Sequence, residues 1–273
     1  MKSHAAPSGR NFYLRKTFMP TIDADAHVLE TEQTWESMDG ADKKYRDIWR
    51  QEKQRLRWAA VVSLLTMDQA LAEARCAKEN GACAIFMRGT EGDRLLSDPY
   101  FYPLYEEAQR LDIAVGVHAA NGSATLYDYY KYESVGFSKF KLNCVGGFHS
   151  MVMDRIPERF PKLRIGFLEI SAEWLPYAYT DLSKRLRIKG KELPRDFMKQ
   201  DGIFVACETT DDIPYIVSKL GEDNIVIGAD YAHADSATEL LALHNLSADP
   251  RLTPALAQKI VGANAQALYG LQC

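Results

Sequence analysis

The sequence predicts an α/β fold of the (β/α)8-barrel type, with a parallel sheet covered by helices. Short apolar segments alternate with amphipathic segments of helical period along most of the 273 residues. The apolar segments are almost continuously hydrophobic, which is typical of parallel strands that are buried on both faces. Most of these segments end in a charged or imidazole side chain, as expected where strands converge on the mouth of a barrel.

The elements follow in a regular order. Residues 1–20 are polar and predict a flexible N-terminal arm, and residues 21–273 predict one barrel domain. The segment "TIDADAH" predicts the first strand, on which Asp23, Asp25 and His27 would share a face. Further strands are predicted at 57–65, 82–88, 112–118, 163–169, 202–208 and 224–230. Helices are predicted at 67–80, 99–111, 171–186, 211–221, 236–245 and 253–270, and the segment from 119 to 161 is predicted to be mostly helical.

This count gives seven strands, one fewer than a closed barrel of this type requires. The eighth would have to lie between residues 28 and 56, a section too polar to predict a strand. We therefore expect a distorted (β/α)8 barrel in which this strand is either short and irregular or missing. An open doubly wound sheet is the alternative, but no GxGxxG or GxxxxGK[ST] motif follows any predicted strand.

Composition excludes several classes of protein. The formal net charge is -4 and hydrophobic residues make up 47%, so a basic nucleic-acid surface is not expected. The apolar runs are too short to span a membrane, and the first 20 residues lack an apolar core of signal-peptide length, so we expect a cytoplasmic protein. Five cysteines without a CxxC pair argue against a disulfide framework and against a thiolate zinc site.

Four residues at predicted strand ends indicate a metal site. Asp25 and His27 leave the first strand, His118 ends a strand in mid-chain, and Asp230 ends the last strand. A single histidine at a strand end is usually a hydrogen-bonded structural group. Two imidazoles and two carboxylates at one mouth, however, suit a divalent ion such as Zn, Mn or Fe. Such an ion lowers the pKa of a bound water and polarises a substrate oxygen.

Five stretches together resemble a known family. They are "IDADAHVLE", "IAVGVHAANG", "RIPERFPKLRIGFLEISAEWLPY", "IVIGADYAHAD" and "IVGANAQALYGL", spread over residues 21–270. In order and spacing they resemble the amidohydrolase-related enzymes of the aminocarboxymuconate-semialdehyde decarboxylase type. The resemblance implies a distorted (β/α)8 barrel with one divalent metal. It also implies non-oxidative decarboxylation of small unsaturated or aromatic acids, or hydrolysis of related compounds. By position it assigns the metal ligands to Asp25, His27, His118 and Asp230.

Two positions depart from the family pattern. The first ligand is often histidine in the family, and Asp25 makes the site harder, which favours Mn or Fe beside Zn. The decarboxylases place a histidine after the strand written here "RIGFLE", where this chain has Glu169. We expect Glu169 to act as general base toward a metal-bound water, or to bridge to a second metal. The alternative is an ion pair with a nearby cation.

Two further histidines are candidates. His149 precedes the strand at 163–169 on a predicted helix, and it would either join a second metal or the substrate, or stay on the helix surface. His233 follows Asp230 by three residues, so we expect it to orient that aspartate or to face the substrate as a catalytic group. The alternative for His233 is a loop histidine bonded to backbone.

Arg88 and Trp174 are the candidates for substrate binding. Arg88 ends a strand, and a guanidinium at the mouth suits a substrate carboxylate; the alternative is a salt bridge to Glu91 or Asp93. Trp174 would line the pocket, or it would be a core residue.

The sequence therefore predicts a metal-dependent hydrolase or non-oxidative decarboxylase acting on a small organic or aromatic acid. Zinc is the expected ion, with manganese or iron, or two ions, as alternatives. A two-metal Fe/Mn oxygenase on the same scaffold is the runner-up, and a catalytically silent barrel subunit of a hetero-oligomer is the third interpretation. We expect a homodimer, with no nucleic-acid or membrane partner.

Overall fold

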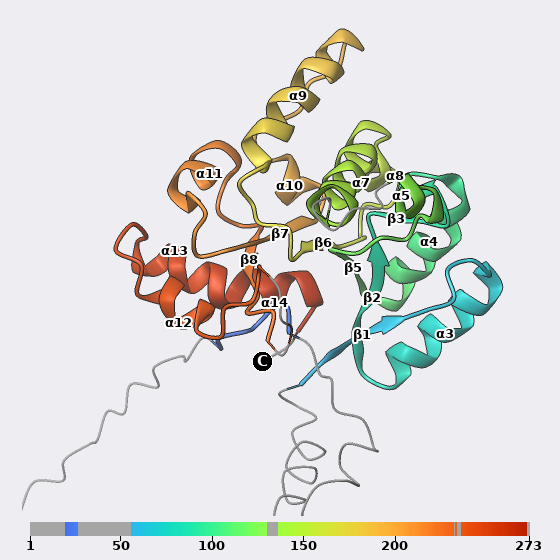
Figure 1. Ribbon diagram of the computed structural model, residues 1–273, viewed down its shortest axis with the longest axis horizontal. Helices are drawn as coiled ribbons and strands as arrows, with labels where there is room; N and C mark the ends of the chain where they lie inside the picture. Colours follow the sequence, from blue (N-terminus) through green and yellow to red (C-terminus); the bar gives the residue numbers. More distant parts are fainter. Residues whose placement is uncertain (1–19, 27–55, 130–135, 232, 234–235, 272–273) are drawn as a thin grey trace, which may run out of the picture.

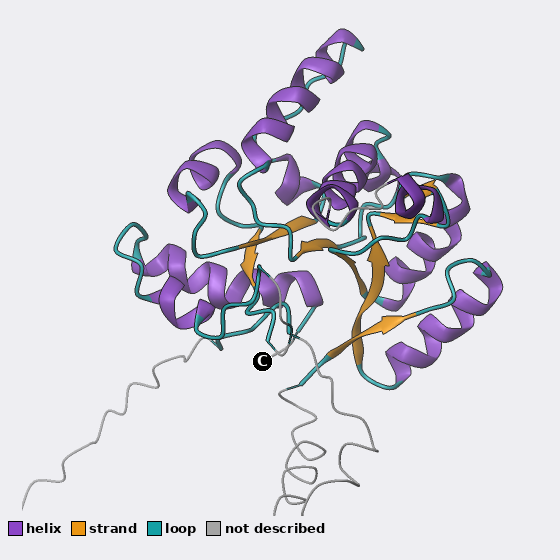
Figure 2. Ribbon diagram, in the orientation of Figure 1, coloured by secondary structure: helices purple, strands orange, loops and turns teal. Residues whose placement is uncertain are grey.

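The computed structural model of the protein describes residues 20–26, 56–129, 136–231, 233 and 236–271. Its centre is a six-stranded parallel sheet with the order β1-β2-β5-β6-β7-β8, which confirms the predicted α/β class (Figure 2). The strands are β1 Trp58–Val61, β2 Ala82–Arg88, β5 Ala114–His118, β6 Ile165–Leu168, β7 Ile203–Cys207 and β8 Ile225–Ile227.

The beginning of the described chain lies beside β8 and extends this sheet (Figure 1). The amide of Ala24 donates to the carbonyl of Ile227 at 3.0 Å, and the amide of Asp230 donates to the carbonyl of Asp25 at 2.9 Å. A parallel bridge joins Ala26 to Tyr231. All seven predicted strand segments are thus part of one parallel arrangement. The predicted arm before residue 20 and the eighth strand sought between 28 and 56 lie outside the described residues.

Helices cover the sheet, and several predicted helices form as shorter pieces. They are α3 Met67–Glu79, α4 Tyr102–Leu111, α5 Ala124–Tyr129, α6 Gly136–Lys139, α7 Lys141–Met153, α8 Ile156–Arg159, α9 Leu175–Ile188, α10 Phe197–Gln200, α11 Ile213–Leu220, α12 Ala242–Ser247, α13 Pro254–Gln258 and α14 Asn264–Tyr269. A hairpin, β3 Thr90–Glu91 and β4 Arg94–Leu95, follows β2, and a 3-10 turn, Pro99–Phe101, precedes α4. None of the described helices is long and apolar enough to cross a membrane.

Backbone conformation explains where the predicted helices break. The end of the mostly helical segment predicted over 119–161 is interrupted because Arg155 adopts a left-handed φ of 59° between α7 and α8. The helix predicted over 253–270 contains a π-helical turn, Lys259–Ala263, between α13 and α14. The helix predicted over 236–245 begins only at Ala242.

The two faces of the sheet carry different side chains. The outer face packs large residues against the helices, among them Ile85, Met87, Val115, Val117, Ile165, Phe167, Ile203, Val205, Ile225 and Ile227. The inner face mixes the small residues Ala84, Ala114 and Ala206 with the larger Leu168, Phe204 and Val226, and it packs against Leu268 of α14. A side chain on Gly166 would meet Leu268, so the glycine lets α14 pack closely on the inner face. Because side chains alternate along β5, Ala114 and His118 point to this inner face.

An ion-pair cluster connects α3 to α4. Glu107, only 8% exposed, accepts hydrogen bonds from Arg110 at 2.6 Å and from Arg75 at 2.5 Å. The bond from Arg110, followed by the bond from Arg75, lowers the pKa of Glu107 to about 2, although burial acts in the opposite direction. The folded state therefore stabilises the charged form of Glu107 relative to the protonated form.

Replacing Glu107 by Gln should lower the free energy of unfolding at pH 7 by about 1–2 kcal/mol. The folded pKa lies below the ordinary value of 4.5, so this stabilisation is complete above about pH 4.5 and disappears as pH falls toward about 2. Urea unfolding of the wild type and E107Q between pH 7 and pH 3 measures the difference in their free energies of unfolding. The exposed neighbour Glu106, changed to Gln, should show no such trend. A difference independent of pH would contradict the interpretation.

Candidate active site

Four acidic or imidazole side chains converge where strands of the sheet end, a region that we call the mouth. They come from different elements, so the fold and not local sequence brings them together. Each is buried, with exposed fractions between 2% and 8%. They are Asp25 beside β8, His118 at the end of β5, Glu169 directly after β6, and Asp230 shortly after β8.

His118 lies between two of the carboxylates. Its Nε2 atom is 3.3 Å from Asp25 Oδ1, and its Nδ1 atom is 3.0 Å from Glu169 Oε2. Burial lowers the pKa of His118, but the hydrogen bonds to Asp25 and Glu169 outweigh burial and raise the pKa to about 10. The thiol of Cys144 donates to the backbone carbonyl of His118 at 3.0 Å, which fixes α7 to the end of β5. A metal ion at Nε2 would compete with a proton for the same atom.

Asp230 and Glu169 are also within reach of a second histidine. His233 Nδ1 lies 3.3 Å from Asp230 Oδ2 and 3.6 Å from Glu169 Oε1. The hydroxyl of Thr238 donates to Asp230 Oδ2 at 3.0 Å. Glu169, Asp230 and His233 offer ligand atoms that lie within 4.8 Å of one another. The His233 side chain is 46% exposed, so it faces solvent whereas both carboxylates are buried.

The backbone is strained at both buried carboxylates. Glu169 has a φ of 58° and Asp230 has a φ of 46°, in the left-handed region that costs a residue other than glycine about 1–3 kcal/mol. Along β6, Ile165 and Phe167 point outward, so regular alternation would send residue 169 outward as well. The left-handed backbone at Glu169 breaks this alternation, and the Glu169 carboxylate lies at the mouth.

Asp211 supports the loops after β6 and β7, a role that sequence reasoning missed. Its carboxylate accepts from the Ser171 hydroxyl at 2.7 Å, from the Ala172 amide at 2.8 Å and from the Glu208 amide at 2.9 Å. It is 1% exposed, and burial raises its pKa despite these bonds. The only signal in the sequence was an acidic residue shortly after a strand, which does not distinguish a support from a ligand.

Asp23 connects the first segment to the loop after β8. Its Oδ1 atom accepts from the amide of Ala229 at 2.8 Å and from the amide of Asp25 at 3.2 Å. Burial raises the pKa of Asp23 to about 6; the two hydrogen bonds oppose the rise, and the charges of Asp25 and Asp230 add to it. Asp23 therefore fixes the backbone that carries the two carboxylates of the mouth.

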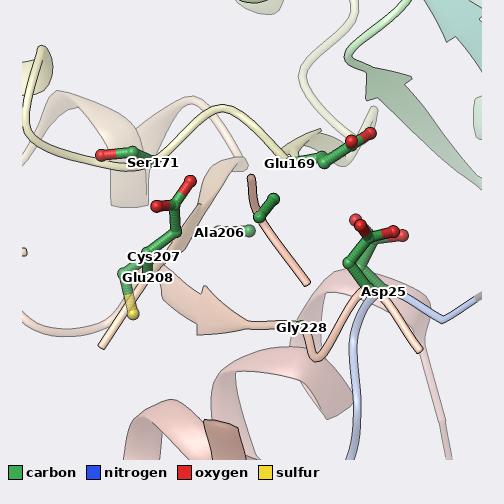
Figure 3. A pocket seen from close by; sticks show the side chains of 9 residues that line it. Asp25, Glu169, Ser171, Ala206, Cys207, Glu208 and Gly228 are labelled. Atoms are coloured by element: carbon green, nitrogen blue, oxygen red, sulfur yellow. The ribbon is translucent and has the colours of Figure 1, made fainter. Parts of the chain in front are cut away.

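A small cavity lies among these groups (Figure 3). It is lined by Asp25, Glu169, Ser171, Ala206, Cys207, Glu208, Gly228, Asp230 and Ala237. Its volume for the centre of a water molecule is about 10 Å³, which is about the room that one water or one ion requires. A side chain on Gly228 would collide with Asp25, so glycine at this position permits the close approach of the first segment.

Neither of the two predicted substrate-binding residues lines this cavity, although Arg88 is the neighbour of His118 in the sheet. Arg88 donates to Glu91 through Nη2 at 2.5 Å and through Nε at 3.0 Å, which is the salt bridge given above as the alternative. Trp174 donates from its indole to the carbonyl of Ser171 at 2.7 Å and packs edge-on against Phe148. Its ring is thus part of the core beside α7.

His149 is likewise not brought to the other candidates. Its Nε2 atom lies 3.0 Å from Asp181 Oδ2 on α9, and the same oxygen accepts from Arg185. We therefore do not retain His149 in the proposed site. His27, predicted as a metal ligand, lies outside the described residues.

The donor set fits a divalent cation. Burying three carboxylates together is costly unless positive charge compensates them. Two atoms that bind one ion at about 2.1 Å lie roughly 3.0–3.4 Å apart, and His118 Nε2 and Asp25 Oδ1 are separated by 3.3 Å. Oxygen and imidazole ligands suit Mn, Zn and Fe. Asp25, His118 and Asp230 are the residues that could hold the ion, with Glu169 beside them.

The chain belongs to the Amidohydrolase family, whose sequence profile matches residues 19–271. This confirms the family indicated by the resemblance, which includes decarboxylases of the aminocarboxymuconate-semialdehyde type. Among solved structures it is similar to an amidohydrolase from Mycobacterium avium subsp. paratuberculosis, with a TM-score of 0.66 and 21% identity. That match covers 80% of this chain and 58% of the other, so this chain spans less than two thirds of that relative.

Two similar structures are aromatic acid decarboxylases with bound manganese. One is 5-carboxyvanillate decarboxylase from Novosphingobium aromaticivorans, with a TM-score of 0.69 and 17% identity over 91% of this chain and 73% of that one. The other is dihydroxybenzoic acid decarboxylase from Polaromonas sp. JS666, with a TM-score of 0.65 and 17% identity over 87% and 76%. At these identities the likeness shows the fold, which is the TIM-barrel fold of the amidohydrolases.

The close approach at Gly228 gives a test of the site. Gly228→Ala should destabilise the protein by about 1–3 kcal/mol and weaken manganese binding at least tenfold, because the new methyl group displaces Asp25. Thermal unfolding and calorimetric titration with MnCl₂ measure the two effects. Gly146→Ala on α7 is the matched control, since its methyl group would meet nothing within 4 Å. If both variants bound manganese like the wild type, Asp25 would not be a ligand.

Proposed function

We propose that this protein is a metal-dependent enzyme that removes a carboxyl group without oxidation from a small aromatic acid. One observation carries the proposal: Asp25, His118, Glu169 and Asp230 converge, buried, at the mouth of an amidohydrolase fold. The likeness to manganese-containing decarboxylases of hydroxylated benzoic acids supports the substrate class. Hydrolysis of a related compound is the neighbouring possibility within the family.

Asp25, His118 and Asp230, together with His27, would hold the ion. Because the set is rich in carboxylates, we propose manganese ahead of zinc. When bound, the ion supplies a Lewis acid that polarises a substrate oxygen and lowers the pKa of a bound water. Glu169 Oε2 lies 3.0 Å from His118 Nδ1, so the charge of this carboxylate favours an imidazole whose Nε2 atom is on the side of Asp25.

Glu169 and His233 are the groups that would move a proton. In decarboxylation the C–C bond breaks, CO₂ leaves, and the electron pair remains on a ring carbon that must then be protonated. His233 is half exposed and 3.6 Å from Glu169, so it can exchange protons between solvent and this carboxyl group. In hydrolysis the same carboxylate would take the proton from water.

One observation keeps a second function open. Glu169 is within reach of both His118 and His233, so this carboxylate is placed to bridge two ions. A two-metal iron or manganese oxygenase would use such a bridge. A catalytically silent barrel is less well supported, because it gives no reason to bury so many acidic groups in one cavity.

The manganese-loaded protein should release CO₂ from a hydroxybenzoate in a panel that includes 2,6-dihydroxybenzoate and 5-carboxyvanillate. Asp230→Asn should reduce the rate at least about 100-fold, because it removes charge from the metal site. Asp68→Asn, the same change on the exposed start of α3, should leave the rate unchanged. CO₂ release and metal content per chain are measured together.

The alternatives give different results in the same experiment. Two equivalents of iron or manganese per chain with consumption of O₂ would support the oxygenase. A metal-loaded protein that releases no CO₂ from any acid of the panel would contradict the decarboxylase proposal. Absence of bound manganese in the wild type would contradict the metal site itself.

A further inference from the structure

A lysine reaches the mouth from the first residue of α7. Lys141 Nζ lies 3.0 Å from Glu208 Oε1. Glu208 directly follows β7 and lines the cavity with Asp25 and Glu169 (Figure 3). Both partners of the pair are partly buried, with exposed fractions of 19% and 25%. This ion pair is therefore part of the rim of the cavity and not a contact on the outer surface.

The position of α7 determines where the lysine side chain lies. Next to Lys141, α7 is fixed to the β5 side of the mouth, because Cys144 donates to the carbonyl of His118 and Asn143 donates to Thr90. The ammonium group nevertheless reaches Glu208, after β7. In the sheet β6 lies between β5 and β7, and Glu169 follows β6. The Lys141–Glu208 pair therefore connects the start of α7 to the β7 side of the mouth, next to the strand that Glu169 follows.

The mouth is rich in negative charge, and Lys141 is a cation on its rim. The cavity is lined by four carboxylates, which repel an anionic substrate: Asp25, Glu169, Glu208 and Asp230. Arg88 is engaged by both oxygens of Glu91. An ammonium group has three donors, of which Glu208 accepts one. Lys141 can therefore donate to a second carboxylate while it remains paired.

We propose that Lys141 binds the acid group of the substrate, and that Glu208 holds the ammonium group over the cavity. The ligand class is an aromatic acid whose carboxylate accepts from the lysine at the rim of the cavity. This inference rests on the proposed function, which it deepens by naming a substrate-binding residue. Lys141 takes the role that the sequence had assigned to Arg88.

Binding of one matched pair of ligands tests the inference. The manganese-loaded full chain is titrated with 4-hydroxy-3-methoxy-5-nitrobenzoate and with its methyl ester, which lacks the carboxylate but keeps the nitrophenol. Lys141→Met should weaken binding of the acid at least about tenfold, because a hydrogen bond to a charged group is lost, and should change binding of the ester less than twofold. Lys141→Arg should keep the preference for the acid.

A second lysine is the control. Lys139 on α6 lies only two residues away, but its ammonium group is over the ring of Tyr127. Lys139→Met should leave the affinity for both ligands unchanged. Unaltered binding of the ester shows in each variant that the site is folded.

The possible failures can be distinguished. If the wild type prefers the acid and Lys141→Met binds it as tightly, the role of Lys141 is refuted and the proposed function stands. Equal weakening of acid and ester in Lys141→Met would also refute this role. If the manganese-loaded wild type binds neither compound, both the inference and the proposed substrate class are wrong.

Discussion

The site depends on the pairing of the chain's first described segment with its last strand. Two backbone hydrogen bonds, between Ala24 and Ile227 and between Asp25 and Asp230, bring together carboxylates from opposite ends of the domain. Gly228 allows the close approach, and the hydroxyl of Tyr269 on α14 donates to the carbonyl of Ala24 at 2.6 Å. Helix α14 thus fixes the segment that carries the first proposed ligand, so the site depends on contacts between distant parts of the chain.

The buried negative charge at the mouth is partly compensated by the groups around it. Three carboxylates within one small cavity are costly, and the left-handed backbone at Glu169 and Asp230 adds strain. Part of this cost is offset by neighbouring groups: the Thr238 hydroxyl donates to Asp230, and the His118 imidazole lies 3.0 Å from Glu169. Asp211 in turn fixes the loops in which these side chains lie. A divalent ion would compensate the remaining charge, which is the physical reason to expect one.

The sequence predicted the sheet well because burial on both faces leaves continuous apolar runs whose ends are readily recognised. Asp25, His118 and Asp230 could be predicted as neighbours because parallel strands end at one edge. The sequence offered Glu91 as one partner of Arg88 but could not decide between it and the substrate, since an unpredicted hairpin orients Glu91. The partner of His149 could not be predicted, since Asp181 belongs to another helix. Side-chain partners depend on packing between elements, and periodicity carries no information about that packing.

The glutamate at position 169 changes the charge of the mouth as well as the type of side chain found there. The resemblance to the decarboxylases implies a histidine at this position, and relative to that pattern glutamate adds a negative charge to the mouth. Added negative charge strengthens cation binding and weakens anion binding by the same electrostatic principle. A chain with this substitution therefore requires positive charge near the cavity if its substrate is an acid. The proposed ion supplies part of that charge, and Lys141, held by Glu208 on the rim, is placed to supply the rest.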